Sequence, residues 1–243
     1  MIINQIQNVR QASQEDVGFV MWPSSVILSA YLTSSLTPFS SLSCLELGAG
    51  CGLTSLSLSN FFQSIVTTHF NPLVVSNMQN NIAINDLSST ITATTLDFYQ
   101  QSGTSTFWVD TLGNHHPQVD YIVAADVVCN PSDAVAAAKS LHDALKYDGN
   151  ATVVSNTDKH RFGVELFQSE CEKLGMVCSR EVWGVVQVAK LSCSQSLSLC
   201  SGYVPGMEFY VHFIKKRPSF PRWVGCVDTL FFDVVLSILI TKL

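Results

Sequence analysis

Five short apolar runs rich in β-branched residues recur along the chain, at residues 43–48, 64–70, 90–96, 119–126 and 150–156. Each has the length of a buried strand, and helix-like or polar segments separate one run from the next. Strands that alternate with helices in this way form a parallel sheet that is covered on both faces. The hydrophobic pattern therefore predicts an α/β fold.

Local signals mark where several helices begin and end. A proline opens the amphipathic segment from Pro23, and Asn-Pro pairs at 71–72 and 130–131 each offer a capping amide followed by a proline suited to the first helical turn. Residues 161–175 have the pattern of a further helix that ends at a glycine. Beyond it, the runs 176–191 and 207–216 are predicted to pair as a terminal antiparallel hairpin across a serine-rich loop.

Composition favours one large folded domain over residues 1–217. The 243 residues are 47% hydrophobic and 13% charged, with a mean hydropathy of +0.27, which is enough apolar material for a sizeable core. The net charge of -6 and the scattered basic residues give no nucleic-acid footprint. No nucleic-acid partner is expected.

The segment 218–243 is an apolar tail of unknown role. Asp228 and Asp233 interrupt it, and the uncharged run that remains is too short to cross a bilayer. A membrane association is therefore not expected, and the tail is predicted to pack on the domain or a partner, or to be poorly ordered.

Cysteine and histidine patterns give no metal site. The eight cysteines have irregular spacings without paired motifs, and the N-terminus lacks a secretory pattern, so we expect a reduced protein of the cytoplasm, with the nucleus as an alternative. The pair at 115–116 is predicted to lie in a solvated loop. The basic run 159–161 could touch a substrate, although a solvated helix start is the favoured interpretation.

Candidate chemistry concentrates at LELGAGCGL, residues 45–53. Gly48, Gly50 and Gly52 follow a strand and precede a helix, so the backbone can turn tightly and approach a ligand that a Cβ would exclude. A dinucleotide fingerprint would need its third glycine at Leu53, which argues against NAD. Glu46 ends an apolar strand, where a carboxylate needs donors, and is placed to order the loop or hold an ammonium group.

ELGAGCGL resembles the first motif of class I S-adenosylmethionine (SAM) methyltransferases, and the resemblance extends from about residue 18 to residue 216. VMWPSSVILSAYL and AADVVC further resemble motifs of the methyltransferase-like protein-lysine methyltransferases, the group that includes calmodulin-lysine methyltransferase. The resemblance implies a seven-stranded Rossmann-like sheet, mostly parallel with a C-terminal antiparallel hairpin, and S-adenosyl-L-methionine as cofactor. It also implies that Trp22 lies near the methionine end of SAM. Asp126 matches the acid of the fourth-strand motif, whereas Cys129 stands where the family has an aromatic residue.

Further cofactor contacts follow from strand ends. Because ligands of open α/β sheets lie beyond the carboxyl ends of the strands, Asp126 should face the glycine loop and orient either the incoming amine or the amino group of SAM. Its alternative role is to cap the helix near Pro131. Asp97 and Phe98 are predicted to meet the adenine, with a turn cap and a core residue as the alternatives.

His69 occupies the place where the family usually has Asp or Glu, whose two oxygens accept from both ribose hydroxyls. A neutral imidazole has one acceptor nitrogen and one donor, so we expect His69 to contact the ribose and to bind SAM more weakly than an acid would. The alternative is that His69 turns away and Asn71 or Thr68 meets the ribose.

The sequence as a whole predicts a SAM-dependent methyltransferase that modifies a lysine of a protein partner, with Asp126 as the catalytic residue. The aromatic side chains of Trp22, Phe98 and Tyr99 are candidates for sheltering the lysine stem. Methylation of a small amine, or a catalytically weak member that acts as a binding partner, are the alternatives.

Overall fold

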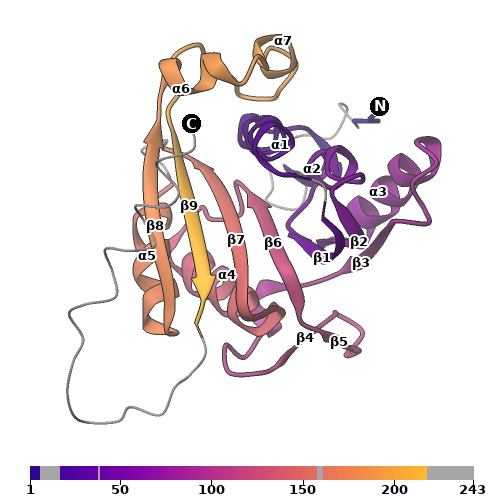
Figure 1. Cartoon of the computed structure of the whole chain (residues 1–243), viewed down its shortest axis with the longest axis vertical. Coiled ribbons are helices and arrows are strands. Elements are labelled where there is room, and N and C mark those ends of the chain that lie inside the picture. The colour runs from indigo at the N-terminus through magenta and orange to yellow at the C-terminus, as the bar shows by residue number, and fades with distance from the viewer. Residues whose placement is uncertain (6–16, 38, 158–160, 218–243) are drawn as a thin grey trace.

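A seven-stranded sheet forms the centre of the molecule in the computed structural model, which describes residues 1–5, 17–37, 39–157 and 161–217 (Figure 1). The strand order is β3-β2-β1-β6-β7-β9-β8. The strands are β1 (Phe39–Leu47), β2 (Phe62–His69), β3 (Ile91–Thr95), β6 (Val119–Ala125), β7 (Leu145–Asn156), β8 (Met176–Trp183) and β9 (Phe209–Lys216).

Pairing within the sheet is parallel from β3 through to β7 and antiparallel at β9 and β8. Both the five predicted strands and the terminal antiparallel hairpin are thereby confirmed. The chain order reverses at β1, which has β2 on one side and β6 on the other. Such a reversal opens a crevice beyond the carboxyl ends of the two central strands.

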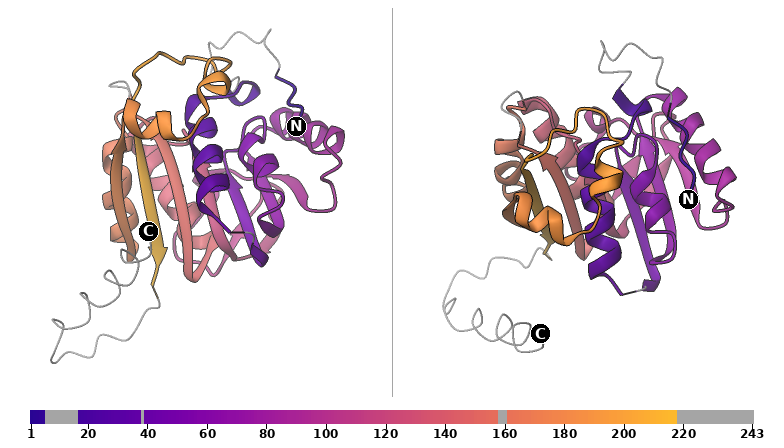
Figure 2. Two further views of the ribbon diagram at one scale, coloured as in Figure 1. Left: turned by 45° about the horizontal axis from the view of Figure 1, so that its top comes forward. Right: turned by 90° about the horizontal axis from the view of Figure 1, so that it is seen from above.

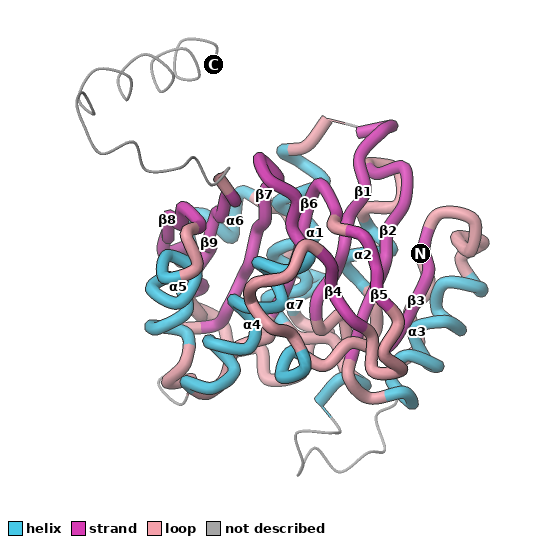
Figure 3. Tube along the Cα trace, turned by 90° about the horizontal axis from the view of Figure 1, so that it is seen from below, coloured by secondary structure: helices cyan, strands magenta, loops and turns pink. Residues whose placement is uncertain are grey.

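Helices cover both faces of the sheet (Figures 1 and 3). One core cluster joins the sheet to α4 (Pro131–Ala144) and α5 (Val164–Lys173), and a second joins it to α1 (Pro23–Ser35), α2 (Leu53–Ser57) and α3 (Pro72–Ile84). Successive residues of β6 alternate between the clusters, because Ile122 and Ala124 belong to the first and Val123 to the second. A strand buried on both faces needs this continuous apolar run.

The two Asn-Pro helix starts are confirmed in atomic detail. Oδ1 of Asn71 accepts a hydrogen bond from the Leu73 amide at 2.9 Å, and Oδ1 of Asn130 accepts from the Asp133 amide at 3.0 Å. Asp133 completes a capping box, since its Oδ2 accepts from the Asn130 amide at 3.0 Å. These caps satisfy amide groups that the first helical turn leaves without partners.

The run 176–191 differs from its prediction. Strand β8 ends at Trp183, and the remaining residues form helix α6 (Val185–Lys190). Gly184 separates the two elements and lets the chain change direction. Periodicity could not separate them, because a short apolar run suits either a strand or a helix.

A small antiparallel hairpin, β4 (Phe107–Val109) with β5 (His115–Pro117), corrects the solvated loop predicted at 115–116. The ring of His116 stacks on Trp108 with 4.0 Å between centroids, and its Nε2 lies 3.0 Å from Oδ2 of Asp110. Burial alone would raise the pKa of Asp110, but hydrogen bonds from Asn114, His116 and nearby amides lower it to about 2. The histidines therefore belong to a structural hairpin.

The connection between β8 and β9 crosses over to the start of the chain (Figures 1 and 2). It carries α6 and α7 (Ser194–Leu197), and α7 packs beside α1. The amide of Ser201 donates to the Met21 carbonyl at 2.9 Å, which ties this connection to the residues just before α1. Two segments far apart in sequence thus meet above the carboxyl ends of the parallel strands.

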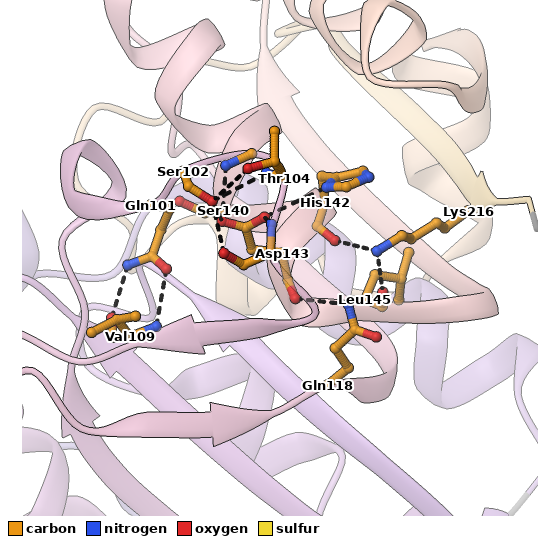
Figure 4. A network of polar contacts seen from close by, with 12 residues as sticks. Gln101, Ser102, Thr104, Val109, Gln118, Ser140, His142, Asp143, Leu145 and Lys216 are labelled. Atoms are coloured by element: carbon orange, nitrogen blue, oxygen red, sulfur yellow. Dashed lines mark hydrogen bonds and ion pairs between the residues drawn. The ribbon is translucent and has the colours of Figure 1, made fainter. Parts of the chain in front are cut away.

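A polar network holds the segment after β3 against the end of α4 (Figure 4). Oδ2 of the buried Asp143 accepts from the Gly103 amide at 2.8 Å and from the Ser102 hydroxyl at 3.0 Å. The Gln101 side chain bonds both backbone groups of Val109, at 2.8 and 3.0 Å. These bonds position the neighbouring residues 97–99, which reach the candidate site.

The described part of the chain contains no helix with the length and hydropathy that crossing a bilayer requires. Residues 218–243, for which the sequence predicts a packed or poorly ordered tail, lie outside the described residues.

Candidate active site

A cavity of about 580 Å³ opens beyond the carboxyl ends of β1, β2, β3 and β6. Its volume is in the range of pockets that hold small-molecule ligands. Eight of the nine predicted cofactor-binding residues line it, namely Trp22, Glu46, Gly48, Gly50, His69, Asp97, Phe98 and Asp126. Gly52 does not line the cavity and instead starts α2, against Met78.

The glycine loop forms the floor of the cavity with backbone alone. Gly48 and Gly50 have φ values of 65° and 55°, a region that side chains disfavour. A Cβ on Gly48 would lie 2.6 Å from Cγ1 of Val127, and one on Gly50 would lie 3.2 Å from the carbonyl oxygen of Gly18. Any larger residue would therefore displace these neighbours or fill the space above the loop.

Glu46 organises the loop from beneath. It is only 1% exposed, and its Oε2 accepts from the Ser55 amide at 2.9 Å and from the Ser55 hydroxyl. Burial raises the pKa of Glu46 to about 7, even though these hydrogen bonds favour the ionised form. Of the two roles predicted for Glu46, ordering of the loop is the one that these contacts serve.

His69 faces the cavity and does not turn away. The ring is 6% exposed, and its Nδ1 accepts from the Asn71 amide at 3.1 Å. In the neutral ring the proton is therefore on Nε2. This nitrogen lies close to Gly18, since a Cβ placed on that glycine would be 2.8 Å from it. Neither Asn71 nor Thr68 lines the cavity. These positions are compatible with the predicted contact between His69 and the ribose, which stays a prediction.

Replacement of His69 by Asp is expected to tighten SAM binding by about ten- to a hundredfold, because a carboxylate can accept from both ribose hydroxyls while Nε2–H can only donate. Calorimetric titration at pH 7 of wild type, His69→Asp and the exposed control His115→Asp measures this. An unchanged or weaker affinity in His69→Asp contradicts the ribose assignment.

The pH window for His69 differs from the one that an ordinary histidine would have. Burial lowers its pKa to about 4, so His69 stays neutral through the range in which a solvated imidazole titrates. Any loss of SAM affinity that comes from protonation of His69 is therefore expected only as the pH falls toward 4.

Asp97 and Phe98 combine the roles that the sequence left open. Asp97 caps a 3-10 turn, because its Oδ1 accepts from the Tyr99 amide at 2.9 Å, and it also lines the cavity. Phe98 packs on the core and approaches the glycine loop, with its Cζ 3.5 Å from the position of a Cβ on Gly48. Tyr99 is 59% exposed and stands at the rim, where its hydroxyl donates to Asp133 at 2.6 Å.

Asp126 stands at the end of β6 in a left-handed conformation with φ 56°, which is uncommon for a residue with a side chain. Its Oδ1 accepts from the Asn156 amide at 2.9 Å, and its Oδ2 is buried without a hydrogen-bond partner in the described part of the chain. The alternative role as a helix cap is wrong, because Asn130 and Asp133 cap α4.

Arg161 lines the cavity, although the sequence favoured a solvated helix start for the run 159–161 and left contact with a substrate as the alternative. Its side chain is 16% exposed, its Nη1 lies 3.3 Å from Oδ1 of Asp126, and its guanidinium carbon lies 5.9 Å from the centre of the Trp22 ring. Nη1 also donates to Sγ of Cys129 at 3.6 Å. Lys159 and His160 lie outside the described residues, so only Arg161 of that basic run can be placed. Its place after a strand end was the one available signal.

Comparison with known proteins agrees with this geometry. The family model described as "Lysine methyltransferase" matches residues 4–172, which is more than half of the chain. The chain belongs to the lysine methyltransferase family. It is thus a class I SAM-dependent methyltransferase, which confirms the resemblance found in the motifs.

One curated relative is human methyltransferase-like protein 22, which is 31% identical to this chain over 83 residues. That match covers 34% of this chain and 20% of the relative's length.

Solved structures show the same fold at low identity. The YcgJ protein of Bacillus subtilis superposes with a TM-score of 0.55 at 10% identity, covering 79% of this chain and 99% of that one. A TehB-like SAM-dependent methyltransferase of Corynebacterium glutamicum has a TM-score of 0.52 at 18% identity, with 78% and 88% of the two chains covered. The seven-stranded methyltransferase sheet is therefore confirmed.

The residues present suit S-adenosylmethionine, the cofactor of this lysine methyltransferase family. Gly48 and Gly50 bring backbone to the cavity wall at positions where a Cβ would crowd Val127 or the Gly18 carbonyl, and the unpartnered oxygen of Asp126 can accept a hydrogen bond from a cationic group. Phe98 presents an aromatic surface that an adenine can stack on.

Proposed function

We propose that this methyltransferase transfers a methyl group to the side chain of a lysine in a protein partner. The observation that carries the proposal is the match of residues 4–172 to a family described as lysine methyltransferases, on a chain whose cavity has aromatic walls and one unpartnered carboxylate oxygen. The cytoplasmic location expected from the sequence, with the nucleus as alternative, belongs to the same proposal. The seven described cysteines, all free thiols, are compatible with a reducing compartment.

Methylation of lysine requires a neutral amine that points at the methyl donor. When bound, S-adenosylmethionine supplies an electrophilic methyl group on a sulfonium sulfur. Deprotonation of a lysine near pH 7 costs about 4 kcal/mol, since its pKa lies about 3 units higher. Apolar walls lower that cost because burial disfavours the charged ammonium.

The chain contributes walls and alignment, and no side-chain nucleophile is needed. Trp22 lines the cavity and Tyr99 stands at its rim, so a lysine stem that enters between them would be sheltered from water, while the ring of Phe98 stays available to the adenine. The pair of Asp126 and Arg161 lies beside Trp22 and so adds little net charge where the neutral amine must arrive.

Cys129 stands where the family resemblance places an aromatic residue, and its side chain is smaller than an aromatic ring. It is exposed and lines the cavity, with its amide donating to Asp133 at 3.0 Å. The smaller side chain favours the second candidate, methylation of a small amine, because it contacts an acceptor less than an aromatic ring would.

The acceptor class is tested with two samples of a cell lysate, one complete and one from which small molecules have been removed. Each sample is incubated with radiolabelled SAM and the purified full-length protein. Label that enters a protein band and is recovered as methyl-lysine after acid hydrolysis is the expected result. Gly50→Arg serves as the inactive control. Label confined to small molecules would replace the protein acceptor by a small amine, and no label above the control would indicate a member that binds without catalysis.

A further inference from the structure

The carboxylate of Asp126 and the guanidinium of Arg161 form an ion pair at the cavity. They lie just after β6 and just before α5, near Trp22. Nη1 of Arg161 lies 3.3 Å from Oδ1 of Asp126 and 3.3 Å from the Asp126 carbonyl oxygen. The Asp126 side chain is 4% exposed and that of Arg161 is 16% exposed. Both residues line the cavity.

The carboxylate of Asp126 is held in place with one oxygen left over. Oδ1 takes the Asn156 amide and the guanidinium, which come from different segments and so hold the carboxylate in one orientation. Oδ2 is buried and bonds to no described group. Because a buried carboxylate oxygen without a donor costs free energy, a ligand that donates a hydrogen bond to this atom would gain binding free energy.

The guanidinium of Arg161 also has N–H donors that can bind a ligand. The side-chain hydrogen bonds of Arg161 to the described residues are made by Nη1, which contacts Asp126 and Cys129. A guanidinium carries five N–H donors in a planar fork that matches a carboxylate. Its other nitrogens can therefore meet an anion without breaking the ion pair with Asp126.

We propose that Asp126 and Arg161 form a subsite for the amino-acid end of S-adenosylmethionine, in which Oδ2 of Asp126 accepts from the α-ammonium and Arg161 donates to the α-carboxylate. A group with both charges on one carbon complements a carboxylate and a guanidinium 3.3 Å apart. The proposal rests on SAM as cofactor and not on which amine accepts the methyl group.

The acceptor amine is a poorer occupant for Oδ2. An unpaired carboxylate would favour the protonated form of an incoming lysine, which cannot attack. Engagement of Oδ2 by the ammonium of the cofactor, together with the charge of Arg161, removes that effect. Arg161 is thus a specificity-determining residue for the cofactor and a positioning residue for Asp126.

The test compares three ligands by calorimetry: SAM, decarboxylated SAM, which keeps the ammonium and lacks the carboxylate, and 5′-methylthioadenosine, which lacks both. Arg161→Met should weaken SAM by about 10- to 100-fold and leave decarboxylated SAM and methylthioadenosine nearly unchanged. Asp126→Asn should weaken SAM and decarboxylated SAM and spare methylthioadenosine. Arg161→Lys should recover part of the loss for SAM.

Arg180→Met is the matched control. Like Arg161, Arg180 forms an ion pair, with Glu165 at 2.6 Å, and lies near an aromatic ring, 4.4 Å from the centre of Tyr210. Unlike Arg161, it does not line the cavity. It should change none of the three affinities. Thermal unfolding of each variant verifies that it is folded, and if Arg161→Met fails to fold, Arg161→Lys and Asp126→Asn carry the test.

Equal loss of all three ligands in Arg161→Met, or an unchanged SAM affinity, would overturn the subsite and leave a purely structural ion pair. Wild-type protein that binds methylthioadenosine as tightly as SAM would overturn it too. A wild-type protein that binds none of the ligands would instead remove the cofactor assignment, and the labelling experiment decides the acceptor separately.

Discussion

Gly50→Arg is expected to abolish SAM binding, with affinity falling by more than about 100-fold, equivalent to about 3 kcal/mol. A Cβ at this position would lie 3.2 Å from the Gly18 carbonyl oxygen, and the remainder of the arginine would have to occupy the cavity above the loop. The φ of 55° adds strain to any side chain there. Calorimetric titration with SAM measures the loss.

Gly113→Arg is the matched control for that variant. Gly113 also has a positive φ, 85°, but a Cβ there would meet nothing within 4 Å, and the residue lies in the turn of the β4–β5 hairpin. Both variants introduce the same charged side chain at a position with positive φ, and only Gly50→Arg introduces it at the cavity. Normal SAM binding by a folded Gly50→Arg protein would show that the cofactor lies elsewhere.

Glu46 is expected to make the wild-type protein less stable as the pH rises from about 4.5 to about 7. Its pKa in the folded state is raised to about 7 from 4.5, so between these values the folded chain holds a proton that the unfolded chain has lost. Unfolding in this window releases that proton, so a higher pH favours the unfolded chain and the free energy of unfolding falls by roughly 3 kcal/mol across the window. Above pH 7 the contribution is constant.

Glu46→Gln removes this titration and keeps an amide oxygen for the Ser55 donors. Urea unfolding at several values between pH 4 and pH 8 should show the difference between wild type and Glu46→Gln narrowing toward low pH and widening toward high pH. Asp148→Asn makes the same chemical change at a side chain that is 66% exposed and serves as the control variant. A constant difference between wild type and Glu46→Gln would contradict a raised pKa.

Whether an element could be predicted depended on whether its sequence signal is contained within that element. The strands of the parallel part of the sheet and the two Asn-Pro caps were predictable, because each depends on residues within one element. The β4–β5 hairpin and α6 were not. Strands of three residues carry too little pattern, and the apolar run 176–191 changes from strand to helix at a single glycine.

The sequence by itself determined the fold class, the glycine loop and the strand-end acid, since the motif at 45–53 and the acid at 126 carry their meaning in a few adjacent residues. Only the tertiary structure decided what surrounds them. In the structure Arg161 lies next to Asp126 and Trp22, Nδ1 of His69 accepts from the Asn71 amide, and Gly52 does not line the cavity. The physical reason is that each of these depends on packing. Arg161 meets partners from separate segments of the chain, and the orientation of His69 and the surroundings of Gly52 depend on neighbours that no local sequence pattern identifies.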